Sequence, residues 1–250
     1  MIAKESAMTA KTVLVTGASG AIGRAIALAF AQRGCDVALH YHTRRKEALS
    51  VREAILAQGG RAEVFPADLT AEAEVDRLFQ EVEADFGPTG ILVNNAGISW
   101  IGLLTDMTLS DWRRVLDGNL TSVFLCCRRA LGPMIRAKSG CIINISSMWG
   151  QRGASCEAAY SAAKAGIIGL TQALAQEEGP SGIRVNCIAP GVIDTPMNAH
   201  LSLEDLAALR EETPLMALGR PEDVAHAAVF LAENRFVTGQ TIGVNGGFVL

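Results

Sequence analysis

The chain has 250 residues, of which 49% are hydrophobic and 19% charged, a composition typical of globular proteins and not of disordered or fibrous ones. Its 22 Lys and Arg against 26 Asp and Glu give a net charge of -4, which argues against a nucleic-acid partner. We expect no membrane span and no secretory signal, since the longest uncharged stretch (86–105) is interrupted by glycines and proline and residues 1–8 lack an apolar run. We therefore expect a cytoplasmic protein. Its six cysteines show no metal-ligand spacing, so we expect reduced thiols and no metal.

Short β-branched runs alternate with helical stretches along the chain. The expected strands are 12–16, 36–39, 62–65, 91–93, 141–145, 184–188 and 241–244. Between them, spacings such as Ile22/Ile26/Phe30 place apolar side chains on one helical face. Nearly continuous hydrophobic strands are typical of a parallel sheet covered by helices on both faces. With no linker, repeat or charge block to divide it, the sequence predicts one α/β domain over residues 1–250, a Rossmann-like doubly wound sheet of about seven strands.

One segment, 195–218, departs from this alternation, because its helical stretch at 203–212 lies between proline-containing turns. Ligands of such folds bind at the carboxyl ends of the strands, where a mobile helix excludes water from a reaction. We interpret 195–218 as a substrate lid. A plain surface excursion is the alternative interpretation.

A glycine-rich turn follows the first expected strand and opens the first helix. It reads Thr16-Gly-Ala-Ser-Gly-Ala-Ile-Gly23. Glycines let the backbone approach a pyrophosphate, and the helix N-terminus offers unpaired N–H donors with a partial positive charge. The turn therefore predicts a dinucleotide site, with an ordinary tight turn as the alternative.

The end of the second strand indicates which dinucleotide binds. An NAD site usually has an acid there for the ribose 2′-hydroxyl, whereas this chain reads His40-Tyr-His-Thr-Arg-Arg-Lys46. Cations at the start of a helix are unfavourable unless an anion is nearby, and a 2′-phosphate is such an anion. NADP(H) is favoured over NAD(H), with His42 and Arg44 as its contacts. A solvated basic turn is the alternative.

Tyr160 and Lys164 lie four residues apart on a helix expected at about 156–178, so their side chains share one face. We expect the ammonium to lower the pKa of the phenol, which would make Tyr160 a general acid for a carbonyl oxygen. Ser147, after the fifth expected strand, brings a hydroxyl to the same crevice, where it orients the substrate carbonyl. Asn119 lies in a helical region and by itself indicates no function.

With these motifs the chain resembles the short-chain dehydrogenase/reductase family over nearly its whole length. The matching pieces are Thr16–Gly23, Asp68, Asn94-Asn-Ala-Gly97, Asn119, Ser147, Tyr160-Ser-Ala-Ala-Lys164 and Pro190-Gly-Val-Ile-Asp-Thr195. The resemblance implies a catalytic tetrad of Asn119, Ser147, Tyr160 and Lys164. In it, Asn119 holds a water that relays protons to Lys164.

The resemblance also implies where the cofactor lies. It implies that Asp68 contacts the adenine, that Asn95–Gly97 pack along the cofactor, and that Pro190–Val192 and Thr195 contact the nicotinamide. The predicted cofactor contacts are Gly17, Ser19, Gly20, Ile22, Gly23, His42, Arg44, Asp68, Leu69, Asn95, Ala96, Gly97, Tyr160, Lys164, Pro190, Gly191, Val192 and Thr195. One departure concerns Gly20 and Ala21, where the family usually has a polar or basic residue followed by glycine, so the arginine that many NADPH-using relatives carry there is absent.

Within the family the chain resembles the 3-oxoacyl-acyl-carrier-protein reductases, which are tetramers, in its length, its basic turn and Val244-Asn-Gly-Gly247. Its pocket loops (143–151, 153–157 and 194–201) resemble reductases of the 5-aminopentanone group on elongation factor P. The predicted pocket residues are Ser99, Trp100, Met148, Trp149, Gln151, Cys156 and Met197. Glu157 either pairs with a substrate amine or is simply an acid favoured at a helix start.

These observations predict an NADPH-dependent reductase that transfers hydride to a ketone, of the 3-oxoacyl-acyl-carrier-protein reductase type. The alternative within the family is reduction of the 5-aminopentanone modification on elongation factor P. A different class, a non-catalytic NADP-binding regulatory protein, shares the fold but has no need of the tetrad. The expected partners are a small or carrier-bound ketone and further copies of the chain in a homotetramer, with no nucleic acid and no membrane.

Overall fold

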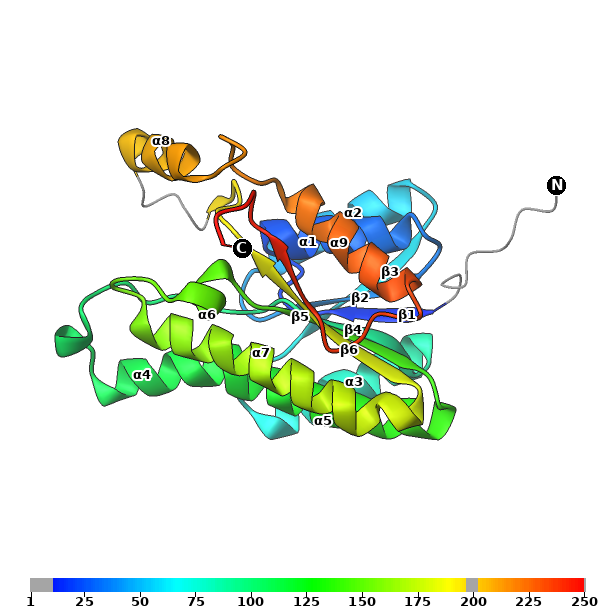
Figure 1. Cartoon of the computed structure of the whole chain (residues 1–250). Helices are drawn as coiled ribbons and strands as arrows, with labels where there is room; N and C mark the ends of the chain where they lie inside the picture. The colour runs from blue at the N-terminus through cyan, green and yellow to red at the C-terminus, as the bar shows by residue number, and fades with distance from the viewer. Residues whose placement is uncertain (1–10, 197–201, 250) are drawn as a thin grey trace.

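The computed structural model describes residues 11–196 and 202–249 (Figure 1). Its strands form one parallel sheet in the order β3-β2-β1-β4-β5-β6-β7. The strands are β1 (Thr12–Val15), β2 (Asp36–Tyr41), β3 (Arg61–Pro66), β4 (Thr89–Asn94), β5 (Gly140–Ile145), β6 (Ile183–Pro190) and β7 (Thr241–Val244). The predicted doubly wound sheet is therefore confirmed. Its order reverses between β1 and β4, which is where such folds bind their ligands.

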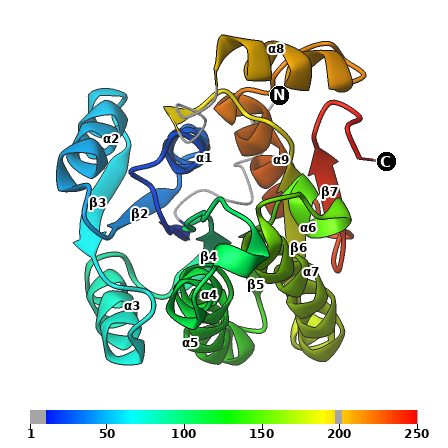
Figure 2. The same cartoon turned by 90° about the vertical axis from the view of Figure 1, so that its left-hand side faces the viewer.

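Helices cover both faces of the sheet (Figure 2). One layer contains α1 (Ala21–Ala31), α2 (Arg45–Ala57) and α9 (Pro221–Glu233), and the other contains α3 (Glu72–Phe86), α4 (Leu109–Leu116), α5 (Ser122–Ala137) and α7 (Ala158–Glu178). Two further helices, α6 (Met148–Arg152) and α8 (Leu203–Glu212), lie at the carboxyl edge of the sheet. Functional side chains on α6, α7 and the strand ends are thereby brought to one edge.

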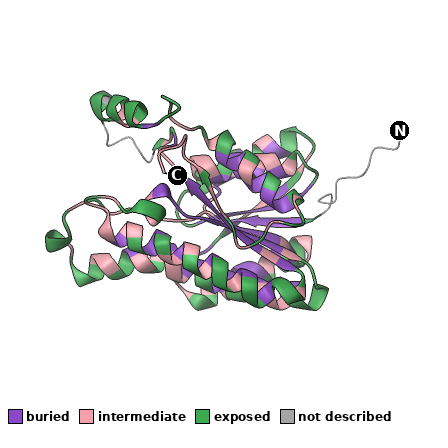
Figure 3. Ribbon diagram, in the orientation of Figure 1, coloured by how far each residue is buried: buried purple, intermediate pink, exposed green. Residues whose placement is uncertain are grey.

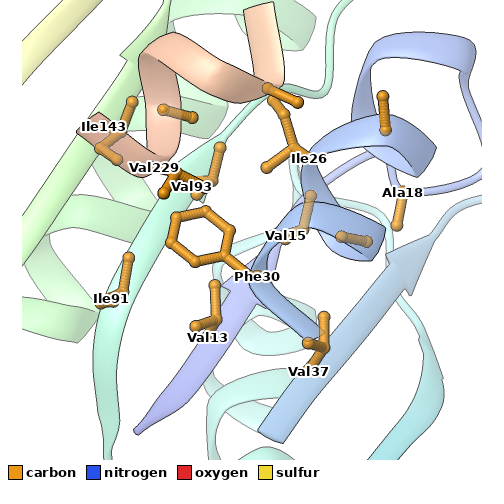
Figure 4. Close-up of a cluster of buried hydrophobic side chains, with 14 of the residues drawn as sticks. Val13, Val15, Ala18, Ile26, Phe30, Val37, Ile91, Val93, Ile143 and Val229 are labelled. Atoms are coloured by element: carbon orange, nitrogen blue, oxygen red, sulfur yellow. The ribbon is translucent and has the colours of Figure 1, made fainter. Parts of the chain in front are cut away.

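Each face of the sheet has its own hydrophobic core, because successive strand side chains point to opposite sides. In β1, Val13 and Val15 pack beneath α1 and α9, where they meet Phe30 (Figure 4). Leu14 points the other way, into the core beneath α3, α5 and α7. The strands inside the sheet are buried on both faces (Figure 3), which accounts for their nearly continuous apolar sequence, whereas the edge strands β3 and β7 are only partly buried.

The predicted elements differ from the structure mainly at their ends. Strands β4 and β6 are the most extended relative to their predictions, and α7 begins at Ala158 instead of about 156. The helix predicted at 203–212 is confirmed as α8. Five of the six cysteines are buried, and only Cys156 is partly accessible. No helix among the described residues is both long and apolar enough to cross a membrane.

Candidate active site

The glycine-rich turn between β1 and α1 is closed so tightly that side chains do not fit in it. Gly17 has a φ of +63°, and a Cβ there would lie 2.9 Å from the Cα of Ala96. A Cβ on Gly23 would lie 2.4 Å from the carbonyl oxygen of Gly17. Gly20, the N-cap of α1, provides no side-chain cap for the first helical N–H groups. A cradle of bare backbone at a helix N-terminus fits a pyrophosphate.

The basic turn after β2 lies beside this cradle. Arg44 is the N-cap of α2, and Arg45 and Lys46 follow in the first helical turn, all three exposed. The guanidinium Nη2 of Arg44 lies 3.7 Å from the position of a Cβ on Gly20. Among the described residues, no acidic side chain forms an ion pair with Arg44. The structure therefore brings a cation of this turn to the phosphate-binding turn, while His42 is exposed on the same turn.

His40 is a residue of this region whose role the sequence analysis missed. Its ring is buried, and its Nδ1 accepts a hydrogen bond from the N–H of Gly17 at 3.1 Å. The proton is then on Nε2, which donates to the carbonyl oxygen of Ala67 at 3.0 Å. Burial lowers the pKa of His40 to about 4, so the ring is neutral at pH 7. The signal in the sequence is that His40 is a polar residue in an otherwise apolar strand that ends beside the predicted basic turn.

The predicted adenine contact, Asp68, follows directly after β3. Its carboxylate accepts hydrogen bonds from the backbone N–H of Thr70 at 2.9 Å and from the Thr70 hydroxyl at 2.7 Å. These two bonds hold the pKa of Asp68 below its ordinary value. The neighbouring Leu69 is buried. Asp68 is thus an ionised acceptor held in one orientation at the edge of the crevice.

The loop after β4 is tied directly to the glycine-rich turn. The side-chain amide of Asn95 donates to the carbonyl oxygens of Thr16 and Gly17 at 3.0 and 3.1 Å. The Thr16 hydroxyl accepts from the backbone N–H groups of Asn95 and Ala96. These bonds hold the two sides of the switch point together, so the predicted contacts of both loops form one surface.

Asn119 and Lys164 converge on Gly97. Asn119 is completely buried in a π turn (Asp117–Thr121) that joins α4 to α5, a distortion frequent at functional sites. Its amide nitrogen donates to the carbonyl oxygens of Ile98 and Val115, both at 2.8 Å, and its Oδ1 accepts from the N–H of Ile98 at 3.2 Å. A Cβ on Gly97 would lie 2.5 Å from that Oδ1 and 3.4 Å from the Nζ of Lys164. The fold therefore brings Asn119 and Lys164 together, although 45 positions separate them in the sequence.

Tyr160, Lys164 and Ser147 form a second part of the same cluster. Lys164 is buried, its Nζ donates to the carbonyl oxygen of Ile145 at 2.9 Å, and it lies 5.5 Å from the centre of the Tyr160 ring. Ser147 is the N-cap of α6, and its Oγ accepts from the N–H of Trp149 at 3.1 Å. A hydrogen bond also joins the Ser147 and Tyr160 side chains. All four predicted tetrad residues thus lie around one end of α7.

The prediction that Lys164 lowers the pKa of Tyr160 is wrong for this structure. Burial raises the pKa of Tyr160, the Glu157 carboxylate adds to the rise and the hydrogen bond from Ser147 opposes it, which together give a pKa of about 12. Burial also lowers the pKa of Lys164 to about 8. Desolvation outweighs the attraction because it disfavours the charged forms of both groups. The phenol is a neutral proton donor at pH 7, and the lysine exchanges its proton near physiological pH.

The predicted pocket residues lie on loops next to this cluster. Ser99 and Gln151 are exposed, Trp100, Trp149 and Cys156 are half-buried, Met148 is buried, and Met197 lies outside the described residues. The N–H of Gly102 donates to the carbonyl oxygen of Cys156 at 2.9 Å, and the Trp100 ring packs against Gly102. The loops that carry Trp100 and Cys156 are therefore in contact, although 56 positions separate the two residues.

The remaining predicted contacts lie at the end of β6 and beneath α8. Pro190 is buried, while Gly191, Val192 and Thr195 are half-buried. Helix α8 begins at Ser202 with a capping box, in which Ser202 and Asp205 bond to each other's backbone N–H groups. A cleft of about 340 Å³ opens at its base, lined by Asp194, Arg210, Met216, Ala217, Leu218 and Arg220. Helix α8 lies near the carboxyl edge of the sheet (Figure 1), but residues 197–201 of the predicted lid lie outside the described residues, so the lid at 195–218 stays a prediction.

A tight glycine cradle at the switch point of a doubly wound sheet, next to a half-buried tyrosine and a buried lysine and serine, defines an oxidoreductase that uses a nicotinamide dinucleotide. A family model described as enoyl-(acyl carrier protein) reductase matches residues 17–249. The chain belongs to the short-chain dehydrogenase/reductase family, whose members bind a nicotinamide cofactor and act on ketone or hydroxyl groups. The predicted resemblance is confirmed.

Known proteins are similar to this chain in sequence or in structure over nearly their whole length. The chain is 43% identical to a 3-oxoacyl-[acyl-carrier-protein] reductase of Synechocystis, over 98% of this chain and 99% of the relative. It is 44% identical to nodulation protein G of a Rhizobium species, over 97% and 98% of the two chains. Among solved structures, that of a candidate gluconate dehydrogenase from Agrobacterium tumefaciens superposes with a TM-score of 0.93 at 35% identity, over 97% and 98% of the chains.

Proposed function

We propose that the protein is an NADPH-dependent reductase of 3-oxoacyl thioesters carried on an acyl carrier. The observation that carries this proposal is the convergence of Ser147, Tyr160 and Lys164 beside the glycine cradle, because that arrangement places a neutral proton donor where a ketone oxygen can be held. The choice of substrate is supported by relatives named 3-oxoacyl-[acyl-carrier-protein] reductase in Synechocystis and Staphylococcus aureus.

The preference for NADP(H) over NAD(H) is supported by the basic turn. Arg44 lies against the phosphate-binding turn, and His42 is exposed beside it. A guanidinium binds a phosphate through two parallel hydrogen bonds, and an imidazole N–H can donate a further one. The 2′-phosphate of NADP(H) would be held by these side chains, while the pyrophosphate would be held by the unpaired N–H groups at the N-terminus of α1, since the N–H of Gly17 already donates to His40.

The proposed mechanism assigns one task to each tetrad residue. When bound, the nicotinamide supplies the hydride. Ser147 and Tyr160 donate hydrogen bonds to the ketone oxygen, and Tyr160 transfers its proton as negative charge develops there. Lys164, with a pKa near 8, returns a proton to Tyr160 and is reloaded through a water held by Asn119. The segment 195–218 closes over the ketone and excludes water.

We also propose that copies of the chain assemble as a homotetramer. Large apolar side chains are exposed on α4, α5 and α9, among them Leu109, Phe124 and Phe230. Exposed apolar surface on several helices is typical of surfaces that pack against further copies. The molar mass from light scattering on the purified protein tests this, and a monomer would contradict it.

A second candidate function is reduction of a ketone that carries an amine, such as the 5-aminopentanone group on elongation factor P. It is favoured by Glu157, whose carboxylate lies close enough to Tyr160 to raise the pKa of the phenol. A carboxylate near the proton donor would attract a substrate ammonium. If Glu157→Gln turned over an aminoketone as fast as the wild type, this candidate would be excluded.

The test is consumption of NADPH, followed by its fluorescence, with an acetoacetyl thioester as substrate and NADH in a parallel assay. We expect rapid consumption with NADPH alone and a loss of at least about 10²-fold in kcat for Tyr160→Phe, because a positioned proton donor is removed. Tyr41→Phe, which changes the only other tyrosine of the chain, is the matched control. Tight NADPH binding without turnover of any ketone would favour a regulatory protein instead.

A further inference from the structure

The five residues after β7, Asn245–Val249, form a folded C-terminal tail. Gly246 and Gly247 have φ values of +63° and +88°, a backbone conformation that favours glycine. The Asn245 side chain bonds in both directions, accepting from the N–H of Gly247 and donating to the carbonyl oxygen of Val249, each at 3.0 Å. The N–H of Phe248 donates to the carbonyl oxygen of Asn245 at 3.1 Å. The tail therefore has a defined conformation up to Val249.

This tail contacts two segments of the proposed site through its backbone. A Cβ on Gly191 would lie 2.7 Å from the Cα of Asn245, so the end of β6 packs directly against the tail. On its other side the carbonyl oxygen of Gly246 accepts from the N–H of Leu215 at 3.1 Å, just beyond α8. A Cβ on Gly246 would lie 2.5 Å from the side chain of Thr213. The tail thus lies between Gly191, at the end of β6, and the residues that follow α8 (Figure 2).

At its end the tail contacts α6. The Phe248 ring meets the Trp149 indole edge to face, with centroids 5.6 Å apart and an interplanar angle of 88°. The guanidinium of Arg152 lies 5.8 Å from the centre of the Phe248 ring. Trp149 is half-buried and is two residues from Ser147. The Oγ of Ser147 accepts a hydrogen bond from the backbone N–H of Trp149. The indole of Trp149, close in sequence to the proposed ketone site, therefore packs against the folded tail.

We propose that Phe248 is a specificity-determining residue, which limits the length of the acyl chain that the enzyme accepts by holding Trp149 in the pocket wall. This inference rests on the proposed function. Edge-to-face packing favours one orientation of the indole, and without the Phe248 ring the indole is free to move away from the pocket. The Ser147 hydroxyl is placed by its own capping bond to α6 and does not depend on Phe248. Loss of Phe248 therefore changes substrate preference more than turnover.

The experiment compares kcat/KM for 3-oxodecanoyl and acetoacetyl thioesters of N-acetylcysteamine. For Phe248→Ala we expect the ratio of long to short substrate to rise about tenfold, as for changes of a few methylene groups in a pocket wall, while kcat for the short substrate changes little. Phe248→Tyr keeps the ring and should match the wild type. Phe236→Ala is the matched control, because Phe236 is fully exposed and precedes β7 at the opposite end of the strand. A ratio within about twofold of the wild type would overturn the proposal.

A second readout does not depend on turnover. The emission of Trp149 is isolated as the difference between each protein and its Trp149→Phe counterpart, since the chain has three tryptophans. In Phe248→Ala we expect this emission to shift to longer wavelength, because the freed indole gains contact with water. Phe248→Leu, which retains apolar volume, gives the same comparison if the alanine variant does not fold. If the wild type reduces neither thioester, the proposed function fails, and an unshifted emission would then overturn the role of Phe248 as well.

Discussion

The close approach at Gly97 leads to a strong prediction about catalysis. In Gly97→Ala the new Cβ would lie 2.5 Å from the Oδ1 of Asn119, about 1 Å closer than ordinary contact allows. Asn119 cannot yield without cost, since it is completely buried and bonds to Ile98 and Val115 through both ends of its amide. Breaking one of these buried hydrogen bonds costs about 1–3 kcal/mol. That energy corresponds to a rate loss of about 5- to 150-fold if it falls on the transition state.

The assay measures kcat with an acetoacetyl thioester, the Kd of NADPH by fluorescence, and the midpoint of thermal unfolding. We expect kcat of Gly97→Ala to fall at least about tenfold. Gly169→Ala is the matched control, because Gly169 is exposed on the same helix as Lys164 and a Cβ there meets no atom within 4 Å. That control should keep its kcat and gain up to about 1 kcal/mol of stability from helix propensity.

A Gly97→Ala variant that keeps more than about half of the wild-type kcat would contradict this prediction, since a displacement of about 1 Å near reacting groups should be costly. A fall in thermal stability with unchanged kcat would have the same meaning. It would show that Asn119 moves without disturbing Lys164, and that the convergence at Gly97 concerns packing and not proton transfer.

Three further predictions concern the charged and polar groups around the site. Because burial lowers the pKa of Lys164 to about 8, kcat/KM for ketone reduction should decline as pH rises through 8 and the protonated lysine is lost; a rate that is flat from pH 7 to 9.5 would contradict this. Arg44→Ala should raise the KM for NADPH about tenfold and leave that for NADH nearly unchanged, whereas equal changes would place Arg44 away from the 2′-phosphate. His40→Ala should weaken NADPH binding about tenfold, since Gly17 and Ala67 each lose a hydrogen-bond partner, and His40→Asn should restore part of it. Between pH 5 and 8 the Kd of the wild-type protein for NADPH should not change through protonation of His40, because the pKa of His40 is about 4.

Features set by neighbouring residues could be predicted from the sequence by itself. The period of apolar residues determined the strands and helices, and the glycines of 16–23 determined a turn that no larger residues can form. Tyr160 and Lys164 share a helix face because they are four residues apart. The cations at 44–46 lie together at the start of α2 because they are contiguous in the sequence. Each of these depends on backbone geometry over one or two turns.

Only the tertiary structure decided the features that depend on burial or on contacts between distant segments. The pKa of Tyr160 rises because the fold removes the phenol from water, which the spacing of Tyr160 and Lys164 cannot show. His40 binds Gly17 and Ala67 only because β2 lies between the two loops, and Phe248 reaches Trp149 only because β7 ends beside α6. The sequence determined which residues carry the chemistry, while desolvation and packing, which arise only once the chain is folded, decided their charge states and neighbours.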